Sequence, residues 1–162
     1  MTKAEILVLA DIHGRTDLAC QALGRLVKRP DAVLFLGDGL NGLEDVPFHT
    51  DLFCVRGNCD YGPAWDHVPK ERTVDIGGVK IFMTHGHLYG VKSGIGRLCM
   101  EASARGADAV LFGHTHEPFE EPLKLPGSEK TVLLMNPGSL CDGCFGTLTV
   151  TDGCILAGFG RL

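Results

Sequence analysis

Two histidines follow an apolar run and a glycine in the segment from Val110 to His116. Residues two apart on an extended backbone point to the same side, so an extended chain would direct His114 and His116 into one cavity. Neutral imidazole nitrogens bind ions such as Zn, Mn, Fe, Co or Ni. The pair therefore indicates a metal site at a strand end if further ligands lie upstream, and otherwise two surface or turn histidines.

Four upstream apolar runs also end in residues that bind metals. These runs are residues 5–10, 32–36, 52–55 and 79–83. The residues that follow them are, in chain order, Asp11, His13, Asp38, Asn58 and His85. Taken singly, each has another explanation, such as an Asx turn at Asp11 or a simple turn residue at Asn58. Because open α/β sheets place their ligand sites at the carboxyl ends of strands, the five together predict one shared site.

The segments between these strand ends predict the elements that position them. Thr16 is a suitable N-cap for a helix whose apolar residues recur at helical spacing as far as Val27, with Pro30 as its stop. A second helix is predicted over residues 93–104, with Gly106 as its stop. Residues 40–50 predict a loop with one helical turn, and residues 117–130 a loop or hairpin end.

Two hairpins add antiparallel pairing to this chain. Gly77-Gly78 separates the arms 73–76 and 79–83, and Asp152-Gly153 separates the arms 146–150 and 154–157. Residues 131–135 predict one more strand. Residues 61–72 predict an irregular segment whose Tyr61 and Trp65 pack onto the domain or else flank a substrate. Together these elements predict an α/β fold of stacked sheets covered by helices.

Length and charge limit the classes of protein that fit. The 162 residues suit a single domain, 1–162, and 44% hydrophobic residues exclude a disordered chain. A net charge of −5 argues against a stable nucleic-acid partner, so an anionic substrate would need local positive charge such as metal ions. We expect no membrane span and no signal peptide, and therefore a cytoplasmic protein.

The cysteines are seven in number and scattered, which is not the pattern of a disulfide framework. We expect most of them to be reduced. Cys141 and Cys144 form a Cys-x-x-Cys pair, which can be redox-active or half of a zinc site. Because no second pair stands near it, two reduced loop thiols are the favoured interpretation.

In its order along the chain, the set of candidate ligands resembles the calcineurin-like metallophosphoesterase superfamily. The similar blocks are Asp-x-His, Gly-Asp, Gly-Asn-x-Asp, a Gly-His-type block and Gly-His-x-His, and the likeness spans Asp11 to Ser139. Residues 56–60, 84–90 and 136–139 look most like the small bacterial and archaeal phosphodiesterase branch of that superfamily.

The resemblance implies a four-layer αββα sandwich of two mixed β-sheets flanked by helices, with two divalent metal ions. It assigns Asp11, His13, Asp38 and His116 to the first ion. It assigns Asp38, Asn58, His85 and His114 to the second. A hydroxide bridging the metals would attack a small phosphodiester, and Asp38 would bridge the two ions. Manganese is the expected metal, with iron, nickel or zinc as alternatives.

Catalytic roles are implied for Asp38, Asn58, His85 and His87. The implied activity is that of a phosphodiesterase, and a homo-oligomer, dimer or tetramer, is compatible with it. Two alternatives remain open: a phosphomonoesterase, and a non-catalytic metal-binding scaffold of the retromer-subunit type. Ligand completeness discriminates against the scaffold, because no position of the set is lost.

One position departs from the wider superfamily. Many members carry, where Cys59 stands, a histidine that pairs with the following acid and is proposed to protonate the leaving group. A thiol of ordinary pKa is a poor general acid near neutral pH. His87 is the nearest substitute in the sequence, and a structural hydrogen-bonding role for it is the alternative.

Overall fold

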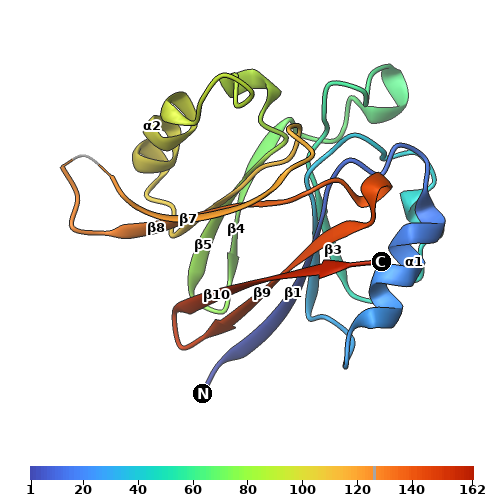
Figure 1. Ribbon diagram of the computed structural model, residues 1–162, viewed down its shortest axis with the longest axis horizontal. Helices are drawn as coiled ribbons and strands as arrows, with labels where there is room; N and C mark the ends of the chain where they lie inside the picture. The colour runs from blue at the N-terminus through green and yellow to red at the C-terminus, as the bar shows by residue number, and fades with distance from the viewer. Residues whose placement is uncertain (126) are drawn as a thin grey trace.

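Two five-stranded sheets lie face to face in the computed structural model, which describes residues 1–125 and 127–162 (Figure 1). The first sheet has the order β10-β9-β1-β2-β3. Its strands are β1 (Lys3–Leu9), β2 (Ala32–Phe35), β3 (Asp51–Cys54), β9 (Cys144–Thr151) and β10 (Cys154–Arg161). The neighbours β1, β2 and β3 run parallel, whereas β9 is antiparallel to both β1 and β10.

The second sheet has the order β4-β5-β6-β8-β7. Its strands are β4 (Glu71–Ile76), β5 (Val79–Thr84), β6 (Ala109–Leu111), β7 (Pro118–Lys124) and β8 (Thr131–Pro137). Here β5, β6 and β8 run parallel, with an antiparallel strand on each side. Both sheets are therefore mixed.

One α-helix covers the outer face of each sheet (Figure 1): α1 (Thr16–Arg25) on the first and α2 (Gly96–Arg105) on the second. The alternation of β1 shows how the layers form. Ile6 and Val8 pack in the core between the sheets, while Leu7 and Leu9 pack in the cluster that contains α1. The predicted αββα sandwich is confirmed.

The parallel strands place their carboxyl ends at one end of the sandwich. The loops after β1, β2 and β3 carry candidate ligands from the first sheet, and the loops after β5 and β6 carry those of the second. The loops themselves are short, with one-turn 3₁₀ segments at Leu43–Asp45, Pro63–Trp65, His87–Tyr89 and Leu140–Asp142. Both sheets thus contribute to one site.

Both predicted hairpins form, but the helix boundaries differ from the prediction. Arg15, rather than Thr16, is the N-cap of α1, and its side chain accepts no hydrogen bond from the described backbone of the first turn. The helix ends at Arg25, so Val27 lies beyond it and is exposed. The second helix begins at Gly96 instead of residue 93 and ends at Arg105. The residue after it, Gly106, has a φ of 63°, the left-handed conformation that glycine adopts at helix ends.

Of the two predictions for residues 117–130, the loop was wrong over half of that length, and the alternative, a hairpin end, fits the antiparallel pair of β7 and β8. The strand β7 occupies Pro118–Lys124 and pairs with β8, while residue 126 lies outside the described residues. The side chains of β7 are mostly exposed, because an edge strand is held by backbone pairing with one neighbour. Proline is tolerated at such an edge, so the polar, proline-containing sequence hid a strand.

Two aromatic residues in the segment between β3 and β4 differ in how they pack. Trp65 is half-buried against the cluster around α1, as predicted, but Tyr61 is 82% exposed and does not pack onto the domain. All seven cysteines, including Cys141 and Cys144, are free thiols. Within the described part of the chain, no helix is both long and apolar enough to cross a membrane.

Candidate metal centre

The candidate ligands lie on unusual backbone. Five of them have positive φ angles: Asp11 (55°), His13 (48°), Asp38 (63°), His114 (68°) and His116 (63°). Residues other than glycine rarely adopt this conformation, and it persists where the surrounding structure enforces it, often at functional sites. The expectation that an extended chain directs His114 and His116 the same way was therefore wrong.

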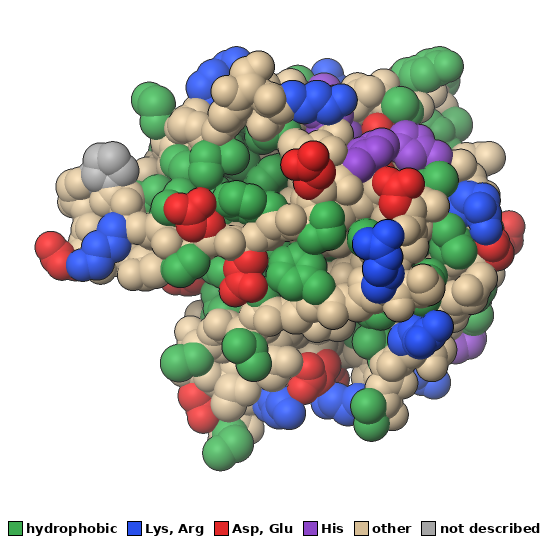
Figure 2. All heavy atoms as spheres, viewed as in Figure 1, with side chains coloured by type: hydrophobic (Ala, Val, Ile, Leu, Met, Phe, Trp, Pro, Cys, Tyr) green, Lys and Arg blue, Asp and Glu red, His purple; other side chains and the backbone are tan. Residues whose placement is uncertain are grey.

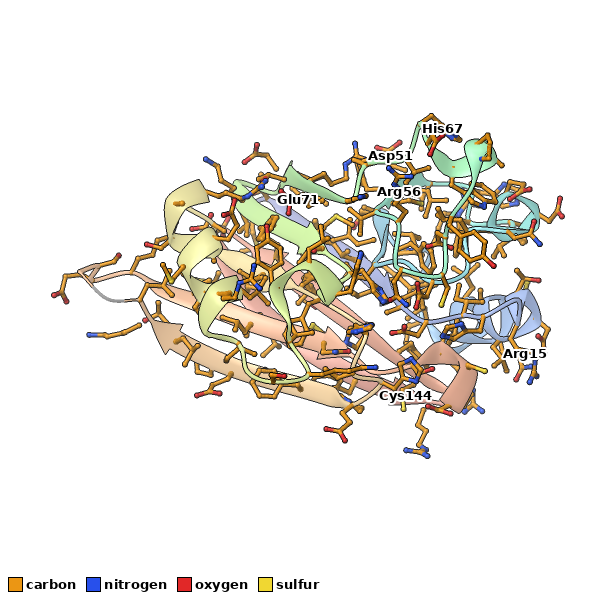
Figure 3. All side chains as sticks on the ribbon, turned by 90° about the horizontal axis from the view of Figure 1, so that it is seen from above. Arg15, Asp51, Arg56, His67, Glu71 and Cys144 are labelled. Atoms are coloured by element: carbon orange, nitrogen blue, oxygen red, sulfur yellow. The ribbon has the colours of Figure 1, made fainter. Side chains whose placement is uncertain are left out.

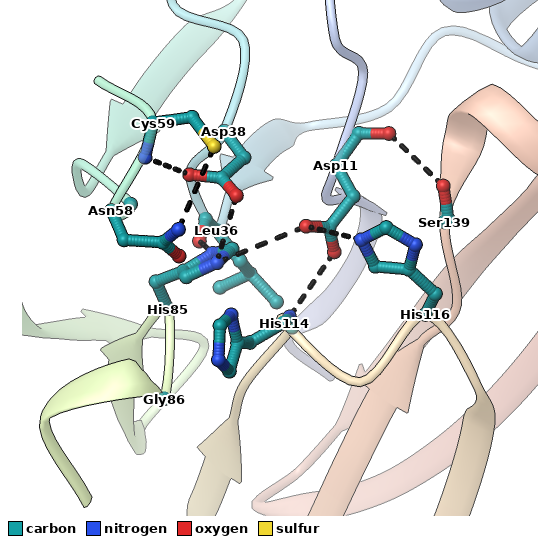
Figure 4. Close-up of polar contacts among 12 residues, drawn as sticks. Asp11, Leu36, Asp38, Asn58, Cys59, His85, Gly86, His114, His116 and Ser139 are labelled. Carbon is teal, nitrogen blue, oxygen red and sulfur yellow. Dashed lines mark hydrogen bonds and ion pairs between the residues drawn. The ribbon is translucent and has the colours of Figure 1, made fainter. Parts of the chain in front are cut away.

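The two histidines instead turn toward different parts of the site. The His114 ring lies 5.1 Å from that of His85, measured between centroids. The His116 ring lies 5.5 Å from that of His13, and its Nε2 is 3.3 Å from Asp11 Oδ1. One short loop thus supplies a candidate ligand to each half of the site (Figure 4).

Asp11 is fully buried at the junction of the two sheets. Its Oδ2 accepts a hydrogen bond from the backbone N–H of His114 at 3.2 Å. Its Oδ1 has no hydrogen-bond partner among the described residues, yet it lies 3.8 Å from Nε2 of both His13 and His85. A buried carboxylate oxygen surrounded by imidazole nitrogens is a metal-binding arrangement.

Asp38 and His85 form the other half. His85 Nε2 lies 3.2 Å from Asp38 Oδ2, and His85 Nδ1 donates to the Leu36 carbonyl at 2.8 Å. That bond fixes the ring and leaves Nε2 facing the site, as ligating histidines generally do. Asp38 Oδ1 accepts a hydrogen bond from the Cys59 backbone N–H at 2.8 Å.

Three groups of side chains each place one ligand atom per residue within 4.8 Å of the others. The groups are Asp11, His13 and His116; Asp38, His85 and His114; and His13, Asp38 and Cys59. Two buried ligand atoms, Asp11 Oδ1 and His85 Nε2, have no hydrogen-bond partner in the described structure. Divalent metal ions fit these groups, because coordination would satisfy the buried atoms.

Asn58 and Cys59 lie beside Asp38 in the close-up of Figure 4, and both are exposed. The Asn58 side-chain amide donates a weak hydrogen bond to Cys59 Sγ at 3.6 Å. The ring of His87 is 5.5 Å from His85 and 6.1 Å from His114. All eight residues named from the sequence thus lie around one centre, and Cys59 approaches two of the candidate ligands. Figure 2 shows a group of histidine side chains, in purple, at the upper right of the surface.

Burial and neighbouring charges have opposite effects on the pKa values of Asp11, Asp38 and His85. Burial raises the pKa of Asp11. Burial also opposes ionisation of Asp38, but the charge of His85, whose Nε2 lies 3.2 Å from Asp38 Oδ2, outweighs it and lowers the pKa of Asp38. For His85 the effect of burial is outweighed by Asp38 and Asp11, which raise its pKa. Burial and the charge of His85 lower the pKa of His114 to about 4.

Metal binding is expected to release a proton from His85 but not from His114. At pH 6.5, the ordinary pKa of histidine, His85 is mostly protonated and the metal must displace that proton, whereas His114 is already neutral. Affinity for Mn²⁺ should therefore increase as pH rises through the pKa of His85. Calorimetric titration at pH 6.5 in two buffers of different ionisation enthalpy counts the protons released.

Two matched variants separate these roles. His114→Gln should weaken Mn²⁺ binding and leave the number of released protons unchanged. His85→Gln should lower both the affinity and the proton count. Loss of proton release in His114→Gln with retention in His85→Gln would contradict the assignment.

Asp60 organises the loops that hold Asp38, although no site role was predicted for it. Its carboxylate accepts four backbone N–H groups, from Asp38 (2.7 Å), Gly39 (2.9 Å), Leu40 (3.0 Å) and Gly57 (2.9 Å). The loop after β2 is thereby joined to the loop after β3. The acid two residues after Asn58 was the only sequence signal for this role.

Gly57 allows these two loops to approach. A Cβ at this position would overlap Asp38 Oδ1, and a Cβ at Gly37 would lie 2.5 Å from the Gly57 nitrogen. Both glycines are therefore required by close packing behind Asp38.

The segment 136–139 supports the opposite side of the centre. The Asn136 side-chain amide donates to the Gly113 carbonyl and to Thr115 Oγ, each at 2.9 Å. The Ser139 hydroxyl donates to the Asp11 carbonyl at 3.1 Å. These buried side chains fix the loops that carry Asp11 and the two histidines, a role that the sequence pattern alone did not reveal.

Comparison with known proteins identifies the family that this fold and site define. The model of the calcineurin-like phosphoesterase superfamily domain matches residues 5–153, and the chain belongs to this superfamily. It is 31% identical to the probable metallophosphoesterase YsnB of Bacillus subtilis over 136 residues, which are 83% of this chain and 74% of that protein. It is also 35% identical to a phosphodiesterase of Methanocaldococcus jannaschii over 78 residues, 48% of this chain and 40% of that one.

Solved structures share the fold over nearly the whole chain. A conserved protein of Streptococcus pneumoniae, titled a predicted phosphoesterase, superposes with a TM-score of 0.80 and 27% identity, covering 99% of this chain and 91% of that one. Vps29 of Entamoeba histolytica complexed with Zn²⁺ superposes with a TM-score of 0.67 and 20% identity, covering 97% and 98%. The second likeness shows the fold alone.

Proposed function

We propose that this chain is a phosphodiesterase that uses two divalent metal ions, with Asp38 between them. The observation that carries the proposal is the convergence of six candidate oxygen and nitrogen ligands at one end of the sandwich, with Asn58 beside Asp38. Two of the six have buried atoms that lack a hydrogen-bond partner in the described structure. A complete set of ligands favours catalysis over a purely structural scaffold.

In the proposed arrangement, one ion is held by Asp11, His13, Asp38 and His116, and the other by Asp38, Asn58, His85 and His114. Mn²⁺ is the proposed metal, with iron, nickel or zinc as alternatives, because a mixed set of nitrogen and oxygen ligands is compatible with all four. When bound, two such ions polarise the phosphoryl oxygens and activate water for in-line attack on phosphorus.

The residues of the chain would hold and orient the reacting groups. Leu36 fixes the His85 ring, the Cys59 backbone fixes Asp38, and Asp60 fixes both loops. Burial and the neighbouring His85 lower the pKa of His87, so His87 is a neutral imidazole near pH 7. We therefore propose that His87 donates a hydrogen bond to the substrate rather than a full proton.

Two hollows beside the candidate ligands favour a diester over a monoester. The basic pocket has a volume of about 340 Å³ and is lined by residues that include Arg56, Asn58, Tyr61, Lys70 and His87. The second pocket has a volume of about 360 Å³. Its lining is mostly apolar but includes three polar side chains: Val91, Ile95, Phe112, Pro118 and Phe119, with Lys92, Thr115 and Glu117. The basic pocket contains the candidate ligand Asn58. The other pocket contains Thr115, whose neighbours in the sequence, His114 and His116, are candidate ligands.

A phosphodiester carries two organic groups on phosphorus, and the two pockets offer a place for each. The partial likeness to an archaeal phosphodiesterase supports the same conclusion. We propose that residues 1–162 act as one domain. Free cysteines are compatible with a reducing compartment, and we propose that this compartment is the cytoplasm.

The proposal is tested by turnover after reconstitution with Mn²⁺, Fe²⁺, Ni²⁺ or Zn²⁺. We expect hydrolysis of bis-p-nitrophenyl phosphate, slower hydrolysis of the monoester p-nitrophenyl phosphate, and no activity without metal. A higher kcat/KM for the monoester would favour the phosphomonoesterase. Absence of turnover with both compounds in protein that binds two ions would favour the scaffold.

The absence of a histidine at position 59 predicts dependence on the leaving group. Cys59 is exposed, but partial loss of hydration, followed by the charge of Asp38, raises the pKa of its thiol, which makes it a still weaker proton donor. We therefore expect aryl diesters to be cleaved faster than alkyl diesters. Cys59→His should narrow this difference by up to about 10²-fold, within the usual range for general acid catalysis.

The comparison needs equal metal content in the two proteins, because Cys59 lies near candidate ligands. If the unmodified protein cleaves alkyl and aryl diesters equally fast, with chemistry rate-limiting, another residue already donates the proton. A His87→Ala variant that loses activity only toward poor leaving groups would then identify His87 as that donor, in place of the hydrogen-bonding role proposed above.

A further inference from the structure

The basic pocket opens beside the candidate metal ligand Asn58. In Figure 3, which views the molecule from above, Arg56 lies on the same side as Asp51 of β3, opposite Cys144. Because the pocket contains Asn58, part of a substrate bound at the metal centre can extend into the pocket. The charge and shape of the side chains that line this pocket therefore affect which substrates the protein prefers.

Two cationic side chains contribute to this wall in a protein of net charge −5. Lys70 is exposed and forms no ion pair with any residue in the described part of the chain. Arg56 is less exposed, at 21%, and one of its terminal nitrogens lies 3.1 Å from Asp66 Oδ1. The Asp66 side chain is 70% exposed, so this pair is open to water and easily rearranged.

The one carboxylate among the described lining residues does not oppose an anion strongly. Asp60 is 6% exposed and its two oxygens accept four backbone N–H groups. The four N–H groups, which belong to the loops after β2 and β3, partly neutralise the charge of the Asp60 carboxylate. Lys70 and Arg56 are therefore the charged groups that remain available to a ligand.

Tyr61 adds a second feature to the pocket. Its ring is 82% exposed at the rim, and packing against the domain does not account for it. Exposed aromatic rings beside a basic groove stack on nucleobases irrespective of base identity. The combination of cations and an exposed ring matches a nucleotide better than a simple alkyl phosphate.

We infer that the basic pocket binds a second phosphate group of the substrate, so that the preferred substrate is a nucleotide phosphodiester bearing a further, terminal phosphate. This inference rests on the proposed phosphodiesterase function. Guanidinium and ammonium groups make charge-assisted hydrogen bonds to phosphate oxygens, whereas a diester without the extra phosphate leaves them unused.

Two matched esters test the inference: thymidine 5′-(p-nitrophenyl phosphate), and the same ester carrying a 3′-phosphate. Both release p-nitrophenolate as water adds to phosphorus and the aryl P–O bond breaks. We expect the Mn²⁺-loaded protein to prefer the 3′-phosphorylated ester in kcat/KM by about 10- to 100-fold, in line with hydrogen bonds to charged groups.

Variants assign that preference to the pocket. Lys70→Gln and Arg56→Gln should each reduce the ratio of the two kcat/KM values by about tenfold. Lys124→Gln removes the same charge from an exposed position on β7 and should leave the ratio unchanged. Lys70 is exposed, so its variant keeps the test available even if Arg56→Gln does not fold.

A binding measurement separates this inference from the proposed function. Calorimetry compares thymidine 3′,5′-bisphosphate with thymidine 5′-phosphate, and we expect tighter binding of the bisphosphate that depends on Lys70. If that preference holds but neither ester is hydrolysed, the pocket assignment stands and the proposed function fails. Equal binding of the two nucleotides, or a preference that survives Lys70→Gln, overturns the inference.

Discussion

Replacing Asp38 by Asn is expected to reduce hydrolysis of bis-p-nitrophenyl phosphate by about 10²–10³-fold or more. Metal content should fall below two ions per chain in the same variant. Asp38 is 3% exposed and lies 3.2 Å from His85 Nε2, and it belongs to two of the three ligand groups. An amide in its place carries no charge, so two cations at about 4 Å would repel each other without a bridging anion.

Metal analysis after gel filtration, together with steady-state kinetics, measures both effects. Asp45→Asn is a suitable control, because Asp45 is an exposed carboxylate in the one-turn segment Leu43–Asp45. The control should keep its metal content and its activity. An Asp38→Asn protein that retains two ions per chain and normal turnover would rule out a bridging role.

The types of the candidate ligands and their positions at strand ends could be predicted from the sequence, but the backbone geometry of the centre could not. Asp11, Asp38 and His85 could be placed at strand ends because a buried strand leaves a local pattern of apolar residues followed by a polar one. The left-handed backbone of His114 could not be predicted in this way. It depends on contacts such as the hydrogen bond to Asp11, a residue 103 positions away in the chain.

Edge elements escaped prediction for a related reason. The strand β7 buries little of its own surface and is defined by backbone pairing with β8, so its side chains show no apolar alternation. The helix α1 ends at Arg25 although Leu26 and Val27 continue the apolar spacing. Local periodicity records which face is buried, but the tertiary structure decides where an element ends.

The role of Asp60 was hidden because its partners are backbone groups. Backbone N–H donors are present at nearly every residue, so no spacing of side chains marks those that converge on one carboxylate. Three of the four donors lie 20 to 22 residues earlier in the chain. Only the folded arrangement of the loops after β2 and β3 brings them together, which makes Asp60 a test of how the centre is held.

Asp60→Ala is expected to lower the free energy of unfolding by about 3 kcal/mol or more, measured by urea denaturation of the metal-free protein. The change leaves four backbone donors without their acceptor, and each buried unsatisfied donor typically costs about 1–3 kcal/mol. Asp60→Asn keeps one acceptor oxygen and should lose less. Metal binding should weaken in both variants, because Asp60 anchors the backbone of Asp38.

Asp66→Ala is the matched control, because Asp66 lies in the same segment but is 70% exposed and pairs only with Arg56 in the described structure. An exposed ion pair contributes about 0–1 kcal/mol, so this variant should unfold at nearly the urea concentration of the unmodified protein. Equal unfolding midpoints for Asp60→Ala and Asp66→Ala would show that the four hydrogen bonds do not stabilise the fold. Unchanged Mn²⁺ affinity in Asp60→Ala would show that the loops hold Asp38 in place without this carboxylate.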